Sequence, residues 1–276
     1  MKRRIKDSMD KAGNIFITLL LLLFLTSCRS EAPEVDGSID HSSFDKILRT
    51  YVSSQGYVDY KSLKANRYEL DNYVSQLAKV SPVSHPKLFP TRQSQLTYWI
   101  NAYNAFTLQG VINHYPTESV QKIYLFSGFF WRLRFTAGGE TMSLYYLENS
   151  IIRKQFNDPR IHFAIVCASE GCPRLANQAY VPEDLDRQLD AQAVKFINEE
   201  RNIKIDLEQN QLIVSKIFEW YKDDFVLPTE TITSYIEPYL SQPKQAQLQK
   251  LKAPKIVYQQ YDWRINDQAR QDSASK

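Results

Sequence analysis

The cysteines Cys167 and Cys172 are the residues of this sequence whose type and spacing point most directly to chemistry. Four residues, Ala-Ser-Glu-Gly, separate them, and a turn of this length can bring two Cα atoms within the roughly 4.4–6.8 Å that a disulfide requires. Gly171 would permit a positive φ in that turn. Closing so short a loop would stabilise the fold by only about 2 kcal/mol. The pair is therefore either a disulfide that shapes the loop or a reactive site with Cys167 as nucleophile or redox thiol.

His162 and Glu148 are the candidates for acid–base or orienting groups. The apolar run IHFAIVCA at 161–168 predicts a short buried strand, in which successive side chains point to opposite faces. His162 and Cys167 would then face opposite sides, so a direct pair would need a bulge or turn at Cys167. A strand histidine is more often satisfied by other protein groups than catalytic, and both interpretations of His162 stay open.

Polar side chains on a predicted long helix at 92–114 are candidates for binding a substrate. Tyr98, Asn101 and Asn104 follow one another at steps of three, which keeps them near one face of the helix. Buried amides need hydrogen-bond partners. The two asparagines therefore either line a pocket and donate to a ligand, or bind the backbone of a neighbouring loop.

Arg160 and Ser169 complete the predicted substrate-binding residues. A guanidinium can hold a carboxylate or phosphate through two parallel hydrogen bonds, but pairing with a nearby Asp or Glu is the commoner outcome. Ser169 lies inside the cysteine loop. Zinc would need two ligands besides the cysteines, whose spacing is not a standard half-site. We therefore expect no metal and no cofactor.

The elements that must position these residues alternate between helices and short hairpins. Apolar residues at helical spacing predict helices near 43–52, 62–80, 92–114, 143–156 and 182–200, with shorter pieces near 217–225, 230–240 and 242–252. Alternating segments around Ala137-Gly138-Gly139-Glu140 and across 202–215 predict two β-hairpins. No internal repeat and no shift in composition marks a second domain. We expect one α+β domain, with helices packed on a small, mostly antiparallel sheet.

The N-terminus resembles an export signal. A basic stretch at 2–11 precedes an apolar run at 15–25, which is shorter than the roughly 18 residues that a membrane-spanning helix needs. Leu25-Thr26-Ser27-Cys28 resembles the bacterial lipobox. We therefore predict that Cys28 is lipidated after cleavage at its amino side. An ordinary secretory signal or an uncleaved anchor is the alternative.

This interpretation divides the chain into a signal peptide at 1–27, the lipidated cysteine with a flexible tether at 28–41, and a folded domain at 42–276. Arg29 stands where a retention signal would carry Asp, which predicts an outer-membrane lipoprotein facing the periplasm or the cell surface. With Cys28 lipidated, two cysteines remain, and an even pair in an exported protein is first a disulfide candidate.

The charge balance argues against a nucleic-acid partner. The chain of 276 residues carries 34 Lys and Arg and 31 Asp and Glu, a formal net charge of +3. Five of the basic residues and two of the acidic ones lie within 1–27, which leaves 29 of each in the predicted mature chain. A neutral domain lacks the basic surface that neutralises phosphates. The expected partners are a membrane, through lipidated Cys28, and a small-molecule or peptide-like ligand.

Five segments together resemble the family called domain of unknown function 547, which occurs in bacteria, plants and animals. They are YWINAYNAFTLQGV (98–111), LENSIIR (147–153), DPRIHFAIVCASEGCPRL (158–175), SKIFEWYKDDF (215–225) and YDWRIN (261–266). They follow the family's order and span most of the predicted mature chain.

The resemblance implies a domain whose biochemistry is unsettled. Some members are fused to glutaredoxin-like domains, which implies thiol or glutathione chemistry. The resemblance also implies a distant likeness to papain- and transglutaminase-like cysteine enzymes, but those enzymes place the nucleophilic cysteine at a helix start ahead of the histidine. Here Cys167 follows His162. Some plant members have Ser at the position of Cys172, so the resemblance does not make this residue essential.

Two functions remain open from the sequence. The first is a lipid-anchored, thiol-dependent hydrolase or transferase, or a thiol-redox enzyme, with its pocket where the helix at 92–114 meets the segment 158–175. The second is a non-catalytic ligand-binding module of the cell envelope, in which a Cys167–Cys172 disulfide shapes the loop.

Overall fold

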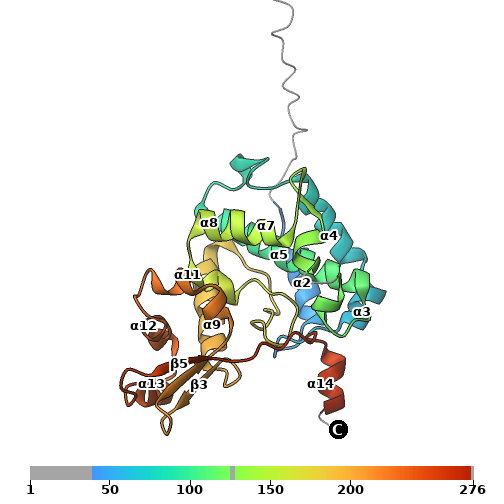
Figure 1. The fold of residues 1–276 in the computed structure, drawn as a ribbon. Helices are drawn as coiled ribbons and strands as arrows, with labels where there is room; N and C mark the ends of the chain where they lie inside the picture. The colour runs from blue at the N-terminus through green and yellow to red at the C-terminus, as the bar shows by residue number, and fades with distance from the viewer. Residues whose placement is uncertain (1–38, 125–127, 275–276) are drawn as a thin grey trace, which may run out of the picture. The chain divides into compact units, whose positions relative to one another are not determined.

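Helix α5 (Arg92–His114) is the longest helix among the residues that the structure describes (Figure 1). The computed structural model describes residues 39–124 and 128–274. Thr91 and Ser94 form a capping box that begins α5, each side chain accepting a hydrogen bond from the other's backbone N–H. Between Leu96 and Ile112 nearly every side chain is buried, as expected of a helix surrounded by protein. The predicted helix at 92–114 is confirmed.

Shorter helices surround α5. Those before it are α2 (Ser42–Tyr51), α3 (Tyr60–Ala65) and α4 (Tyr68–Lys79), so the predicted helix at 62–80 is in fact two helices. Those after it are α6 (Gly128–Arg132), α7 (Leu144–Tyr146), α8 (Arg153–Phe156), α9 (Leu185–Asn198), α10 (Ile217–Trp220), α11 (Lys222–Val226), α12 (Ile232–Ile236), α13 (Gln242–Leu248) and α14 (Gln268–Ala274). A π-helical segment, Leu147–Ile152, joins α7 to α8, and this helical stretch packs on α5.

Two small sheets complete the described fold. Strands β1 (Phe135–Ala137) and β2 (Glu140–Met142) form the first predicted hairpin, with Thr136 opposite Thr141. Strands β3 (Ile203–Asp206) and β4 (Gln211–Val214) form the second. Strand β5 (Lys255–Tyr258) then pairs parallel to β4, which makes the second sheet mixed. The described residues therefore form a single α+β domain, as predicted.

The segment 161–168 is not the strand that its apolar run predicts. A 3₁₀ helix occupies Pro159–Phe163, and irregular backbone follows it. The segment is buried as expected, but Asn104 of α5 satisfies its backbone in place of a neighbouring strand. The Asn104 amide donates to the carbonyl of Ala164 and accepts from the N–H of Val166, both at 3.0 Å. The strict alternation of faces expected for His162 and Cys167 therefore does not apply.

The C-terminal part of the described chain builds its core around Phe163 of this 3₁₀ helix. The Phe163 ring lies 4.9 Å from that of Phe196 on α9 and 5.7 Å from that of Phe225 on α11, centroid to centroid. Leu212 and Val214 of β4 belong to the same buried cluster. The cluster anchors the segment 159–163 from one side while α5 holds the residues after it from the other.

The predictions for the signal peptide at 1–27, the lipidated Cys28 and most of the tether at 28–41 lie outside the described residues. Within 39–124 and 128–274, no helix has both the length and the apolar character that crossing a bilayer requires.

Candidate functional site

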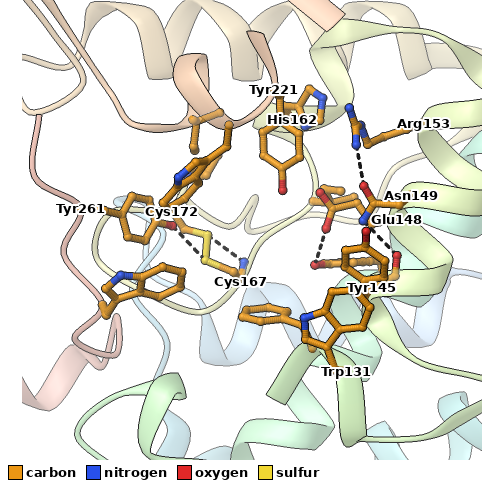
Figure 2. Close-up of a pocket in the computed structure, with 17 residues that line it drawn as sticks. Trp131, Tyr145, Glu148, Asn149, Arg153, His162, Cys167, Cys172, Tyr221 and Tyr261 are labelled. Atoms are coloured by element: carbon orange, nitrogen blue, oxygen red, sulfur yellow. Dashed lines mark hydrogen bonds between the residues drawn. A yellow bond between two sulfur atoms is a disulfide. The ribbon is translucent and has the colours of Figure 1, made fainter. Parts of the chain in front are cut away.

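A pocket with a volume of about 540 Å³ brings together segments that are far apart in the sequence (Figure 2). Its walls are largely aromatic, formed by Tyr103, Phe130, Trp131, Tyr145, Trp220, Tyr221, Tyr261 and Trp263. Its polar and sulfur-bearing lining residues are Glu148, Asn149, Arg153, His162, Cys167 and Cys172. An apolar cavity with a few convergent polar groups is the default candidate for a binding or active site. The three predicted catalytic residues all line it.

The two cysteines form a disulfide in the wall of this pocket, with their Cα atoms 6.1 Å apart. The sulfur of Cys167 lies 2.9 Å from the hydroxyl of Ser169 and 3.0 Å from that of Tyr261. Ser169 in turn donates to the Tyr261 hydroxyl at 3.0 Å. The backbone N–H of Cys167 points to the sulfur of Cys172 at 2.8 Å. Both sulfurs thus have hydrogen-bond donors beside them.

The cysteine loop takes its shape from the segment 262–266, which runs along it. The N–H of Glu170 donates to the carbonyl of Arg264 at 2.7 Å, and that of Gly171 to the carbonyl of Asp262 at 2.8 Å. The residue with positive φ is Ala168, at 60°, and not Gly171 as expected. Left-handed backbone is costly for a residue with a Cβ, and such strain often lies beside functional residues.

Because Gly171 has no side chain, the cysteine loop can lie close to the ring of Tyr261. A Cβ atom on this residue would lie 2.9 Å from two ring carbons of Tyr261. We expect Gly171→Ala to displace that ring and to lower the free energy of unfolding by about 1–3 kcal/mol, since the loop and the ring are both packed. Urea unfolding, with near-ultraviolet circular dichroism as a second signal, measures both effects. Unchanged stability and spectrum would show that Tyr261 is not held against the loop.

Glu148 places a carboxylate in the pocket from the π-helical segment Leu147–Ile152. The side chain is largely buried and accepts a hydrogen bond from the Tyr103 hydroxyl at 3.3 Å. Burial, and after it the Glu148 charge, raise the pKa of Tyr221, so this second phenol of the pocket also stays protonated. π-Helical turns are often found at functional sites.

His162 belongs to a charged group with Asp224 and Arg153. The Nε2 atom of His162 lies 2.7 Å from Oδ2 of Asp224, and the Arg153 guanidinium binds the same carboxylate through two nitrogens, at 2.7 and 2.9 Å. Burial alone would raise the pKa of Asp224, but hydrogen bonds from His162 and Arg153 and their charges hold it well below its usual range. The Tyr221 ring stacks on the His162 ring, 4.0 Å between centroids.

Replacing Asp224 by alanine is expected to lower the free energy of unfolding by about 2–3 kcal/mol near neutral pH, because the buried His162 and the partly buried Arg153 lose their acceptor. The native pKa of this carboxyl is lowered, so its stabilisation is complete above the unfolded pKa of about 3.9. It is lost progressively as the pH falls from there toward the native pKa. Urea unfolding should therefore give a smaller difference between the two proteins near pH 3 than near pH 7. A constant difference would contradict the ion-pair role.

Three predicted binding residues on α5 lie outside the pocket lining. The Asn101 amide donates to the carbonyl of Tyr180 at 2.9 Å and accepts from the N–H of the same residue at 3.0 Å. Asn104 binds the backbone of 164–166 as described above, and the Tyr98 hydroxyl donates to the carbonyl of Leu77. Both asparagines therefore bind the backbone of neighbouring segments, which is one of the two alternatives that the sequence left open. The residue that α5 contributes to the pocket lining is Tyr103.

Arg160 also lies outside the pocket lining. Its guanidinium binds the carboxylates of Asp158, Asp186 and Asp190 at 2.7–2.8 Å, which ties the 3₁₀ helix to α9. Arg160 therefore forms ion pairs with nearby aspartates, which is the commoner of the two outcomes expected for it. Ser169 is buried behind the disulfide, where it contacts Cys167 and Tyr261 rather than a lining surface.

Several pocket residues carry no local signal of function in the sequence. Tyr103 and Tyr145 read as ordinary aromatic residues of predicted helices, and Trp131 as part of the first predicted hairpin. Tyr103, Tyr221, Asp224 and Tyr261 lie in three segments of the family resemblance, 98–111, 215–225 and 261–266, and those segments were the available signal. In the parts of the chain that the structure describes, no group of three or more His, Cys, Asp or Glu is placed to hold a metal ion.

The comparisons with known proteins concern the middle of the chain. Residues 88–197 match the model of a family described as "Protein of unknown function, DUF547". Comparison with curated proteins gave no match, and neither did comparison with solved structures. The matched segment contains Tyr103, Glu148, His162 and both cysteines of the pocket, whereas Tyr261 lies beyond it. The match supports the resemblance to the domain of unknown function 547 family, over the segment that supplies the disulfide.

Proposed function

We propose that this chain is a thiol-redox enzyme that exchanges its Cys167–Cys172 disulfide with a small or peptide-like thiol or disulfide held in the aromatic pocket. The observation that carries the proposal is the pair of hydroxyls, from Ser169 and Tyr261, within 3.0 Å of the Cys167 sulfur in the pocket wall. A hydrogen bond to a thiolate lowers the pKa of the thiol, and the thiolate is the species that attacks a disulfide.

The exchange balances without a further reactant. In the direction that reduces a substrate disulfide, the Cys167 thiolate attacks one substrate sulfur, a Cys167–substrate bond forms, and the other substrate sulfur leaves as a thiolate. The Cys172 thiolate then attacks the Cys167 sulfur and releases the second substrate thiolate. The two released thiolates take up the protons that the cysteines gave up. Two electrons pass from the cysteine pair to the substrate, and the reverse sequence oxidises two substrate thiols.

The surroundings of the two sulfurs suggest their roles. Cys172 is almost fully buried and Cys167 is partly exposed, so a substrate reaches Cys167 more easily. Burial raises the pKa of Tyr261, which therefore remains a donor near neutral pH. The N–H of Cys167 beside the Cys172 sulfur supplies a donor for the resolving thiolate. These contacts support Cys167 as the attacking residue.

Hydrolysis through a His162–Cys167 pair has less support. Nε2 of His162 lies beside Asp224, and among the described residues no hydrogen bond joins the imidazole to Cys167. The second candidate function is a ligand-binding module in which the disulfide only shapes the loop, and the eight aromatic residues of the lining favour it.

Trapping of the mixed disulfide tests the proposal. The reduced Cys172→Ser variant, incubated with glutathione disulfide, should accumulate glutathione on Cys167, and intact mass with peptide mapping measures it. The Cys167→Ser variant is the matched control and should form little adduct on the buried Cys172. Equal labelling of the two variants would overturn the proposal and favour the binding module. So would the absence of labelling in both variants, if the wild-type protein also keeps its disulfide in a glutathione buffer.

We also propose that the protein acts in the bacterial cell envelope as a lipoprotein anchored through Cys28 in the outer membrane. The basic stretch, the apolar run and the lipobox-like motif at the N-terminus support this location, which also suits a disulfide. Labelling of expressing cells with an alkyne fatty acid should mark the wild-type chain and not Cys28→Ala. Equal labelling of both would contradict the anchor.

A further inference from the structure

Glu148 gives the aromatic pocket a negative charge that the surrounding protein does not neutralise directly. Its hydrogen-bond donor is the neutral phenol of Tyr103, at 3.3 Å, and the Tyr221 phenol lines the same pocket. Within 39–124 and 128–274, no Lys or Arg nitrogen lies within 4.0 Å of this carboxylate. Arg153 is the cation of the pocket lining, and its guanidinium is already bound to Asp224 and to the amide oxygen of Asn149.

The other polar donors of the site are directed to Asp224 and not to Glu148. Arg153 binds the Asp224 carboxylate through two nitrogens, and His162 binds it through Nε2. The Glu148 charge contributes to raising the pKa of Tyr103, Tyr221 and Tyr261, after burial, which is the largest cause in each case.

The aromatic faces around this carboxylate are of the kind that bind cations. Trp131 and Tyr145 stack with their centroids 3.4 Å apart, and both are well exposed, at 50% and 39%. Across the cavity, the Tyr261 ring lies 4.7 Å from that of Trp220 and 4.6 Å from that of Trp263. Figure 2 shows Glu148 and Tyr145 on the side of the pocket opposite Tyr261 and Cys172. Aromatic walls combined with a carboxylate form a setting suited to an alkylated ammonium group.

We infer that the pocket takes a ligand with a cationic head, a quaternary or alkylated ammonium group, which lies between Glu148 and the stacked Trp131 and Tyr145. This inference deepens the proposed function by naming the class of ligand. It rests on that proposal in one respect, that this pocket is the binding site. Binding of the head leaves the rest of the ligand to extend toward the disulfide on the opposite wall. The cationic head does not take part in the exchange of sulfur bonds.

Two matched compounds test the inference in the oxidised wild-type protein, where no thiol is free in the pocket. Acetylcholine serves as a cationic probe, and 3,3-dimethylbutyl acetate is its uncharged carbon isostere. We expect the cation to bind at least about fivefold more tightly, measured by quenching of tryptophan fluorescence and by ligand-observed NMR. Equal affinities, or no binding of the cation, would overturn the inference.

Substitutions in the pocket test where the cation binds. Glu148→Gln keeps the size of the side chain and should remove most of the preference for the cation, whereas the exposed Glu208→Gln in the β3–β4 turn should leave it unchanged. Trp131→Ala removes a half-exposed face and should weaken the cation at least about threefold even if Glu148→Gln fails to fold. Unchanged binding in Trp131→Ala would contradict the proposed position. A failure of glutathione trapping leaves these binding results intact, so the two proposals fail separately.

Discussion

Replacing Asn104 by alanine is expected to lower the free energy of unfolding by about 2–6 kcal/mol. The side chain is 1% exposed, and its amide pairs with the carbonyl of Ala164 and the N–H of Val166. Its loss leaves two buried backbone groups without partners, each at a cost of about 1–3 kcal/mol. Because these groups precede Cys167 directly, the variant should also make the disulfide easier to reduce. Urea unfolding and titration of reducible thiols measure the two effects.

Asn113→Ala is the matched control, on the same helix α5. Its side chain is exposed and accepts one hydrogen bond, from Arg67, so its loss should cost less than about 1 kcal/mol. If Asn104→Ala were no less stable than Asn113→Ala, the amide of Asn104 would not be what satisfies the backbone of 164–166. The apolar segment would then owe its irregular conformation to packing around Phe163 alone.

Replacing Tyr261 by phenylalanine is expected to slow alkylation of Cys167 in the reduced protein about tenfold near neutral pH. The Tyr261 hydroxyl lies 3.0 Å from the Cys167 sulfur, and a hydroxyl that donates to a thiolate lowers the pKa of the thiol. Removing the donor should raise that pKa by about one unit, and one unit is a tenfold change in the thiolate fraction below the pKa. The rate of reaction with iodoacetamide, followed from acid to alkaline pH, gives the thiol pKa in each variant.

Tyr146→Phe provides the control, because this tyrosine is 51% exposed and is not among the pocket-lining residues. Its alkylation profile should coincide with that of the wild type. Ser169→Ala added to Tyr261→Phe should shift the profile further in the same direction. Without the Tyr261 hydroxyl as its acceptor, the Ser169 hydroxyl can donate to the same sulfur, 2.9 Å away. A profile for Tyr261→Phe that overlaps the wild type would show that the phenol does not stabilise the thiolate, and the thiol-redox proposal would lose its main support.

The elements of the fold that depend on neighbouring residues could be predicted from the sequence. The cap at Thr91, the apolar residues that follow it and Pro116 beyond the last turn determine the limits of α5. The Gly138–Gly139 pair determines the first hairpin, with both glycines at positive φ. The separation of Cys167 from Cys172 by four residues allows their disulfide. Each of these features depends on contacts within a few residues of chain, which the sequence states directly.

The segment 161–168 shows why local patterns were insufficient. An apolar run of this length is compatible with a buried strand or with any other buried conformation. The decision depends on what pairs with its backbone, and a side chain from α5, some sixty positions earlier, provides that partner. Strand β5 was missed for a similar reason, because its partner β4 lies about forty positions earlier and the pairing is parallel.

Local patterns in the sequence were enough to predict most of the helices, both hairpins, the single α+β domain and the closeness of the two cysteines. Which residues meet at the site depends on long-range packing. Asn101, Asn104 and Arg160 turned out to hold backbone and aspartates, while Tyr103, Tyr221, Asp224 and Tyr261 came to surround the predicted Glu148, His162 and Cys167. The physical reason is that a polar side chain takes whichever partner the packed chain places beside it, and that partner comes from a distant segment.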